Sequence, residues 1–509
     1  MQAARIILLP LYARYLSPGE FGTLEILNRI GDVFNICLMV NGIRSAALTF
    51  YCQAKTRQQQ ETAVATVTLF LIVVLVAAGL GGLIFARPLA RLLGVASPTL
   101  LMFGIVAALL DATTVLPLAL MQARVESLRF ASFSLAMVLV AVSLIIFAVA
   151  GLGWGIWGIL GGYAFTSAVF GGSLTAWELR RGSLRPDWAM FRDVVRYTWP
   201  FVPTGVCMFV LHSADRFFLL RYSGVDDVGV YALGYKLAFV VGMVSVYPLL
   251  QVWKARMYAA FELPNAAVIV ARVVTWMLAA YLFAGMGLWM FQEEIIAIVG
   301  GAGRYAEATQ VIGLILLAYY FATAQGLFDS PLYVFRRTGL KPWITLAAAL
   351  FTVALLAVLV PQWAAKGAAC ALLGGLCFFA LLTLVISQRV FHVRYEFLRL
   401  AVMLLTAIGL VLVAQRLGSG PFAVLEKMGL WATWPALLWL TGVVRADEKR
   451  QAWDVLGSAY RWLLSPFGRG VTWPGRGPSV PVSSLIRAPA ESQASSDAID
   501  VLAKPEGNE

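Results

Sequence analysis

The sequence predicts an all-α integral membrane protein with about 14 transmembrane helices, arranged as two pseudo-symmetric six-helix lobes plus two C-terminal helices. Of its 509 residues, 60% are hydrophobic and only 13% are charged, so a water-soluble globule would expose more apolar surface than it could tolerate. Apolar runs of about twenty residues, enough to cross a bilayer as a helix, recur up to about residue 443. An internal repeat divides these runs into two sets.

Breaks between the apolar runs set the predicted helix boundaries. Pro, Gly and charged residues interrupt the runs, and each remaining stretch suffices for about one span. The first run lacks a small-residue cleavage site, so we expect a first helix there and not a signal peptide. The predicted spans are 3–16, 23–49, 62–86, 97–122, 130–150, 155–178, 198–220, 229–252, 266–290, 308–333, 341–360, 366–388, 397–415 and 424–443.

Lys and Arg predict the orientation, because cytoplasmic connections carry the excess of positive charge. Connections after the even-numbered spans hold 20 Lys and Arg residues, and the other connections hold 8. Both termini are therefore expected in the cytoplasm. The formal net charge of +12 is spread singly or in pairs over helix ends, which argues against a nucleic-acid partner.

A cationic connection and a polar tail set the expected domains. The connection is the longest between spans and predicts an amphipathic cytoplasmic linker, whereas the tail is expected to be partly amphipathic (451–465) and then disordered (470–509). The predicted domains are an N-terminal lobe (1–178), the linker (179–197), a C-terminal lobe (198–388), two further helices (397–443) and the tail (444–509).

One repeat relates the lobes. At an offset of 207 residues, RYLSPGEFGTLEILNR aligns with RYSGVDDVGVYALGYK, so that Gly22 meets Gly229 and Arg29 meets Lys236. Lobes with an even number of helices share one orientation and leave a cavity between them. Duplication and packing alone would also explain the glycines. The first helix is about ten residues shorter than its mate, so either it is partial or the natural start lies upstream of Met1.

Ionisable side chains inside the spans mark the candidate site, because a charge at mid-bilayer needs a partner, a cavity or a function. One helix face carries four polar residues at i, i+3, i+4 and i+7, namely Glu25, Asn28, Arg29 and Asp32. A self-neutralising network and a substrate role both remain open for this face. The predicted cavity cations are Arg29, Lys236, Arg216, Arg44 and Arg272, and the polar or coupling residues are Glu25, Asn28, Asp32, Asp111, Asp215 and Tyr235.

Cations from both lobes suit an anionic head group, because Arg and Lys bind phosphate through charge-assisted hydrogen bonds. His212 is a candidate proton relay, although a hydrogen bond to a neighbouring helix explains it better. Tyr319 and Tyr320 suit either a sugar or the membrane interface. The five cysteines show no metal-type spacing and are interpreted as small core residues.

Two segments, LPLYARYLSPGEFGTLEI and YTWPFVPTGVCMFVLHSADRFFLLRYSGVDDVGVYALGYKLA, resemble the Wzx-type polysaccharide repeat-unit flippases of the MOP superfamily, also called polysaccharide or lipopolysaccharide biosynthesis proteins. The resemblance extends along roughly 1–443. It implies two six-helix lobes in a V around a central cavity, similar in fold to multidrug exporters and lipid II flippases. It also implies a bacterial inner-membrane transporter, not an enzyme, that moves undecaprenyl-pyrophosphate-linked oligosaccharides to the outer leaflet.

The expected mechanism is alternating access without a cofactor. The chain has no GxxxxGK[ST] phosphate loop, so an ion gradient or the membrane potential is the expected driver, with Asp32, Asp111 and Asp215 as coupling candidates. Expected partners are the lipid-linked oligosaccharide, membrane lipid and other polysaccharide-assembly proteins. The alternatives are a multidrug or cation exporter, a membrane glycosyltransferase or polymerase of the same pathway, and a non-catalytic scaffold.

Overall fold

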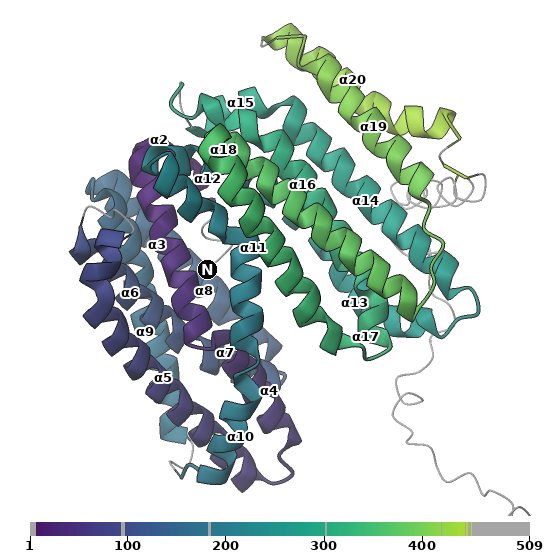
Figure 1. The fold of residues 1–509 in the computed structure, drawn as a ribbon. Coiled ribbons are helices and arrows are strands. Elements are labelled where there is room, and N and C mark those ends of the chain that lie inside the picture. The colour runs from purple at the N-terminus through teal and green to yellow at the C-terminus, as the bar shows by residue number, and fades with distance from the viewer. Residues whose placement is uncertain are drawn as a thin grey trace, which may run out of the picture. The chain divides into compact units, whose positions relative to one another are not determined.

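The structure is a computed structural model, and it describes residues 7–92, 97–181, 185–300, 303–418, 420–442, 444–445 and 449. Within these residues the regular structure is entirely helical (Figure 1). Met1–Pro435 form one compact unit and Ala436–Glu509 a second, of which mainly the end of the last helix is described. The predicted tail segments 451–465 and 470–509 lie outside the described residues.

The helices follow the predicted order. We keep "N-terminal lobe" and "C-terminal lobe" as names for residues 7–178 and 198–388. The N-terminal lobe holds α2 (Leu9–Tyr15), α3 (Pro18–Cys37), α4 (Val40–Gln53), α5 (Arg57–Leu92), α6 (Pro98–Thr113), α7 (Val115–Ala123), α8 (Ser127–Ile146), the π-turn Phe147–Gly151 and α9 (Gly155–Arg181). α10 (Trp188–Thr198) follows, and the C-terminal lobe holds α11 (Phe201–Tyr222), α12 (Val225–Ser245), α13 (Tyr247–Phe261), α14 (Ala266–Met290), α15 (Gln292–Gly300), α16 (Thr309–Phe328), α17 (Ser330–Val334) and α18 (Lys341–Val390). α19 (Phe397–Ala414) and α20 (Pro421–Leu440) complete the described helices.

Fewer helices than predicted pass a test of length and apolarity for membrane spans. Nine helices of the described residues are long and apolar enough to cross a membrane, or up to ten if a bent pair is counted as one span. The predicted spans 155–178 and 424–443 exist as α9 and α20 but are not among the nine. Gly, Ser and Thr lower the apolarity of α9, and Glu426 and Lys427 lower that of α20. The chain is a multi-pass membrane protein, and a total of fourteen spans is not established.

Two predicted spans lie within α18, which is an antiparallel hairpin. Ala364 breaks the helical backbone with φ 47° and ψ −125°. A Cβ added to Gly367 would lie 2.1 Å from the carbonyl oxygen of Leu359, whereas eight residues of continuous helix would separate the two by about 12 Å. The rings of Phe351 and Phe378 lie 4.5 Å apart across the hairpin. The reversal at Ala364 therefore separates the two predicted spans.

One predicted span, 23–49, is bent. It comprises α3 and α4, which meet at 40°, and Met39 between them has a left-handed backbone with φ 50°.

The interpretation of the cysteines as core residues was wrong. None of the five cysteines is buried, and Cys37 and Cys52 are exposed, because they lie on outward helix faces that apolarity alone does not distinguish from the core.

The joint between the lobes lies at Trp199 and Pro200. α10 belongs with the N-terminal lobe: Val194 is fully buried against α4, α5 and α7, and the Asp187 backbone N–H donates a hydrogen bond of 3.1 Å to Thr66 Oγ1. α11, by contrast, packs mainly on α18 (Figure 1). The predicted amphipathic linker is thus held by one lobe, and any rotation between the lobes falls on the two residues that follow it.

Candidate functional site

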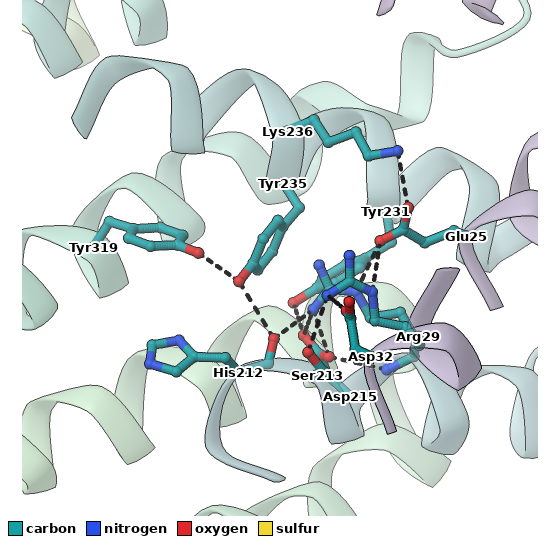
Figure 2. A network of polar contacts seen from close by, with 11 residues as sticks. Glu25, Arg29, Asp32, His212, Ser213, Asp215, Tyr231, Tyr235, Lys236 and Tyr319 are labelled. Carbon is teal, nitrogen blue, oxygen red and sulfur yellow. Dashed lines mark hydrogen bonds and ion pairs between the residues drawn. The ribbon is translucent and has the colours of Figure 1, made fainter. Parts of the chain in front are cut away.

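The candidate site lies where α3 of the N-terminal lobe meets α11 and α12 of the C-terminal lobe (Figure 2). Ser17 begins α3 with a capping box, in which Ser17 Oγ accepts from the Glu20 N–H and the Glu20 carboxylate accepts from the Ser17 N–H. This cap fixes the start of the helix, and Glu25, Arg29 and Asp32 follow at helical spacing on one face. The polar stripe predicted from the sequence therefore points at the other lobe.

Glu25 is the centre of the network. Its side chain is 2% exposed and meets cations from both lobes. Arg29 Nε lies 3.2 Å from Glu25 Oε1, Lys236 Nζ lies 2.8 Å from Oε2, and Arg216 Nε lies 3.9 Å from Oε1. The repeat mates Arg29 and Lys236 thus converge on a single carboxylate, which ties the two lobes together.

Arg216 is held by groups of its own lobe. It is fully buried, and its NH1 lies 2.7 Å from Asp215 Oδ1 and donates to the His212 carbonyl at 2.9 Å. Tyr231 donates a 2.6 Å hydrogen bond to Asp215 Oδ2, and the Tyr235 ring lies 3.7 Å from the guanidinium carbon as a cation–π partner. A buried charge is costly unless it is paired and hydrogen-bonded. These contacts pair the Arg216 charge and satisfy its Nη1, whereas its buried Nε and Nη2 have no hydrogen-bond partner among the described residues.

The network is balanced in charge. Its cations are Arg29, Arg216 and Lys236, and its carboxylates are Glu25, Asp32 and Asp215. Arg29 NH1 also contacts Asp32 Oδ2 at 2.8 Å and Ser213 Oγ at 3.2 Å. The side chains of Arg29 and Lys236 remain 20% and 17% exposed, respectively. In this state the site is a neutral network with two partly accessible cations.

Aromatic side chains extend the network into the C-terminal lobe. Tyr319 of α16 donates a hydrogen bond to the Tyr235 hydroxyl, which itself donates to the His212 carbonyl at 3.3 Å. The Phe239 ring lies 5.8 Å from that of Tyr319. Tyr319 and Tyr235, expected on a cavity or at an interface, therefore belong to one polar chain that ends at Arg216.

A polar cavity lies within the N-terminal lobe, next to the network. It has a volume of about 50 Å³, room for a few water molecules. Asn28, Asp32 and Asp111 line it, together with Asn35 and Tyr163. Asp111 accepts a 3.2 Å hydrogen bond from Ser167. Asp32 is shared, because it both lines this cavity and pairs with Arg29. No group of three or more His, Cys, Asp or Glu side chains in the part of the chain that the structure describes is arranged to hold a metal ion.

Most of the predicted site residues come together, but two cations do not. Arg44 is exposed on α4 and donates a 3.0 Å hydrogen bond to Gln122. Arg272 lies on α14, which contributes no residue to the network in Figure 2. Sequence reasoning missed Ser213, Asn35 and Tyr163. Asn35 continues the α3 stripe at i+3 from Asp32, so helical spacing could have identified it as a site residue. No sequence pattern marks Ser213 or Tyr163.

Two glycines close the lobes beside the network. A Cβ on Gly22 would lie 2.0 Å from the Val225 carbonyl oxygen, and one on Gly229 would lie 1.9 Å from that of Pro18. The two repeat mates also face each other, since the Gly229 Cβ would lie 3.0 Å from Gly22 N. Any side chain would therefore force α3 and α12 apart, and small residues are what permits such a helix approach.

Further contacts join the lobes at this end. Arg14 donates a 3.0 Å hydrogen bond to the Ile298 carbonyl, and Tyr305 donates one of 3.3 Å to the Leu16 carbonyl. The rings of Phe21 and Tyr305 pack edge to face, with centroids 6.2 Å apart. The end of the molecule that holds the α2–α3 and α11–α12 turns is therefore closed.

Comparisons with known proteins agree with this architecture. Residues 2–254 match the family model described as "Polysaccharide biosynthesis protein". The succinoglycan biosynthesis transport protein ExoT of Rhizobium meliloti (strain 1021) is 25% identical over 329 residues, which cover 62% of this chain and 62% of that protein, less than two thirds of its length.

Solved structures show the same fold. A structure of the lipid II flippase MurJ in an inward closed conformation has a TM-score of 0.72 at 12% identity, covering 87% of this chain and 97% of that one. An inward-facing multidrug resistance MATE family transporter of the MOP superfamily has a TM-score of 0.64 at 12% identity, covering 76% and 94%. The predicted fold class is confirmed. Each named relative is a transporter or flippase by its title.

Proposed function

We propose that this chain, which belongs to the polysaccharide biosynthesis protein family by the match of residues 2–254, moves undecaprenyl-pyrophosphate-linked oligosaccharide repeat units across the bacterial inner membrane. One observation carries the proposal: Arg29 and Lys236, one from each lobe and both partly accessible, share the carboxylate of Glu25. A pyrophosphate offers these cations the same kind of charge-assisted hydrogen bonds that the carboxylate offers.

Exchange of anions is the step that loads the site. The network is neutral before the substrate arrives, so a pyrophosphate binds by taking cations away from Glu25 and not by filling a charge deficit. Arg29 and Lys236 are the cations that can turn towards it, because Arg216 is fully buried and held by Asp215. The polyprenyl chain stays in lipid during this exchange. Loss of the shared carboxylate contact then loosens the lobes at the network.

The proposed cycle of alternating access uses the joint at Trp199 and Pro200 and the closed end at the α2–α3 and α11–α12 turns. α10 moves with the N-terminal lobe and α11 with the C-terminal lobe, so rocking bends the chain at Trp199 and Pro200. The predicted orientation places both termini in the cytoplasm and the Gly22–Gly229 contact on the outer side. Separation of these glycines releases the head group outside, and their return resets the transporter.

Gene deletion tests the function directly. We expect lipid-linked repeat units to accumulate on the cytoplasmic side of the membrane and surface polysaccharide to disappear. Normal surface polysaccharide without accumulation would reject the proposal. Vesicles that contain the purified protein and a fluorescent lipid-linked oligosaccharide provide the second measurement, with a cationic dye as the competing cargo.

The paired cations give a sharper prediction. Replacement of Arg29 and Lys236 together by Ala is expected to lower export at least a hundredfold, because one charge-assisted contact from each lobe is lost. Membrane insertion serves as the control measurement, and Arg44→Ala is the matched control variant because Arg44 lies exposed outside the network. Normal export by the double variant, once normal insertion is shown, would contradict the cation role.

The cavity in the N-terminal lobe favours cation coupling. Asp32 and Asp111 line it, and Asp32 also binds Arg29, so a proton or a sodium ion that neutralises Asp32 weakens its hold on Arg29. Asp111→Asn is expected to reduce gradient-driven transport about tenfold while exchange without a gradient persists. Asp193→Asn, an exposed change on α10, is the control. An Asp111→Asn variant with unaltered gradient dependence would remove this residue from the coupling scheme.

Export of a small cation is the second candidate function, and the same acidic cavity is the observation that favours it. The vesicle assay separates the candidates. Transport of the dye with no transport of the lipid-linked sugar would support the exporter, and the reverse would support the flippase.

A further inference from the structure

The two faces of α10 have different environments. With about 3.6 residues per turn, Phe191, Val194 and Thr198 fall on one face. Val194 and Thr198 are fully buried, and the Phe191 ring packs edge-on against Phe70 at 5.7 Å. Tyr197 adds a 3.2 Å hydrogen bond to Thr49. This face docks the helix on the N-terminal lobe and so fixes the orientation of the rest of the helix. The Phe191 ring also stacks on the Trp188 ring, with centroids 5.0 Å apart.

The outer face carries a stripe of alternating chemistry. Trp188, Arg192, Arg196 and Trp199 recur at i, i+4, i+8 and i+11, which places all four within an arc of about 80°. Trp199 keeps a helical backbone (φ −52°, ψ −43°) and so continues the stripe. Trp188 is 69% and Trp199 61% exposed, and both arginines are exposed. We call these four residues the α10 stripe.

The arginines of the α10 stripe are available to a ligand. Neither Arg192 nor Arg196 forms an ion pair with any residue that the structure describes, although Asp193 lies beside Arg192 in the sequence. The exposed Arg185 just before the helix adds a third positive charge near its start. The stripe is therefore cationic, and aromatic residues bound it at both ends.

The length of α11 indicates where the stripe lies relative to the bilayer. Phe201–Tyr222 is 22 residues long, or about 33 Å of helix, which matches the hydrocarbon thickness of about 30 Å. Trp199 then lies at the boundary of the hydrocarbon, where Trp is enriched. Arg196 and Arg192 follow about 5 and 10 Å further along the helix, at and just beyond the phosphate groups.

We propose that the α10 stripe binds the head groups of anionic phospholipids in the cytoplasmic leaflet. This inference rests on the membrane orientation given under the proposed function. Guanidinium groups bind phosphate through paired hydrogen bonds, and juxtamembrane arginines are attracted to an anionic surface. The stripe ends at Trp199, beside the joint with α11, so bound lipid anchors the N-terminal lobe at the point about which the C-terminal lobe turns.

Lipid retention tests the proposal without transport. The full-length protein is reconstituted in nanodiscs of phosphatidylcholine with increasing fractions of phosphatidylglycerol, and retained phosphatidylglycerol is counted by native mass spectrometry. The Arg192→Gln/Arg196→Gln variant is expected to bind phosphatidylglycerol roughly thirtyfold more weakly. The Arg389→Gln/Arg394→Gln variant, which also loses two exposed arginines of a cationic connection, is expected to bind like the parent.

Equal phosphatidylglycerol retention by the parent and the α10 variant would overturn the proposal. If that variant at the same time loses binding to undecaprenyl pyrophosphate, supplied alone as a probe, the stripe serves the transported lipid instead. A protein that retains phosphatidylglycerol through the stripe but does not flip lipid-linked sugar would refute the proposed function and leave this inference standing.

Discussion

Replacement of Glu25 by Ala is expected to destabilise the protein by about 3–5 kcal/mol, since removal of one partner from a buried ion pair leaves an uncompensated charge. Glu25 contacts Arg29, Lys236 and Arg216, and its side chain is almost completely buried. Among these, Arg216 has no exposed surface through which water could reach it. Thermal unfolding in detergent, followed by circular dichroism, measures the loss.

Glu20→Gln is the matched control. Glu20 lies on the same helix five residues earlier, is exposed, and only completes the capping box with Ser17. Its replacement is expected to cost less than about 1 kcal/mol. An equal loss of stability in the two variants would show that the network contributes no more than a surface cap.

A double-mutant cycle separates pairing from packing. Lys236→Met removes the ammonium group that loses its carboxylate contact in Glu25→Ala, so the double variant is expected to lose about 1–3 kcal/mol less than the sum of the single losses. Strict additivity would mean that the 2.8 Å contact between Lys236 and Glu25 has no energetic consequence. The cycle is needed because Glu25→Ala removes buried side-chain volume as well as a charge, whereas Lys236→Met nearly conserves volume.

Transport by Glu25→Gln distinguishes a functional carboxylate from a structural one. The amide keeps the shape of the side chain but no longer competes as an anion for Arg29 and Lys236. Binding of the lipid-linked pyrophosphate is therefore expected to strengthen, while turnover falls because the neutral closed network cannot reform. Weaker binding together with slower turnover would indicate that Glu25 only supports the fold.

The sequence was sufficient for the parts of this site that depend on periodicity and duplication. Helical spacing put Glu25, Arg29 and Asp32 on one face, and the 207-residue offset paired Arg29 with Lys236. Both features are properties of the chain itself. The repeat also paired Gly22 with Gly229, and the structure shows the reason, because the backbones of α3 and α12 touch there.

The contacts between helices could not be predicted from the sequence. Depth in the membrane made Arg44 and Arg272 candidates, but depth does not determine which face of a helix meets the cavity, and neither residue joins the network. The convergence of Arg216 and Lys236 on Glu25 depends on how α3 crosses the C-terminal lobe. The bend at Met39 was also missed: its left-handed backbone breaks a predicted single span just before Asn41 and Gly42, a pair that is typical of turns.

Replacement of Gly229 by Ala is expected to stabilise helix α12 but to reduce export. Within α12 the change favours the helix by about 1 kcal/mol. Between the lobes the new Cβ would lie 1.9 Å from the Pro18 carbonyl oxygen, and neither backbone can yield as a side chain would. The closed end must therefore open, and export is expected to fall at least tenfold although the helix itself is more stable.

Spin labels report the opening. Tyr15→Cys and Tyr222→Cys place one label on each lobe at the closed end, since both side chains are more than half exposed. In a background without the five native cysteines, the distance distribution is expected to shift to longer values in Gly229→Ala and in Gly22→Ala. Gly161→Ala and Gly326→Ala are the controls, because a Cβ at either helical position meets no atom within 4 Å.

The glycine prediction also bears on the direction of the cycle. If the two glycines form the outer closure, the Gly229→Ala protein still binds lipid-linked pyrophosphate from outside but cannot return to the state that loads from the cytoplasm. Uptake into inside-out vesicles is then lost while binding persists. Normal export with an unchanged label distance would mean that small local shifts accommodate the new Cβ without opening the closed end, and the Gly22–Gly229 contact would then be packing alone.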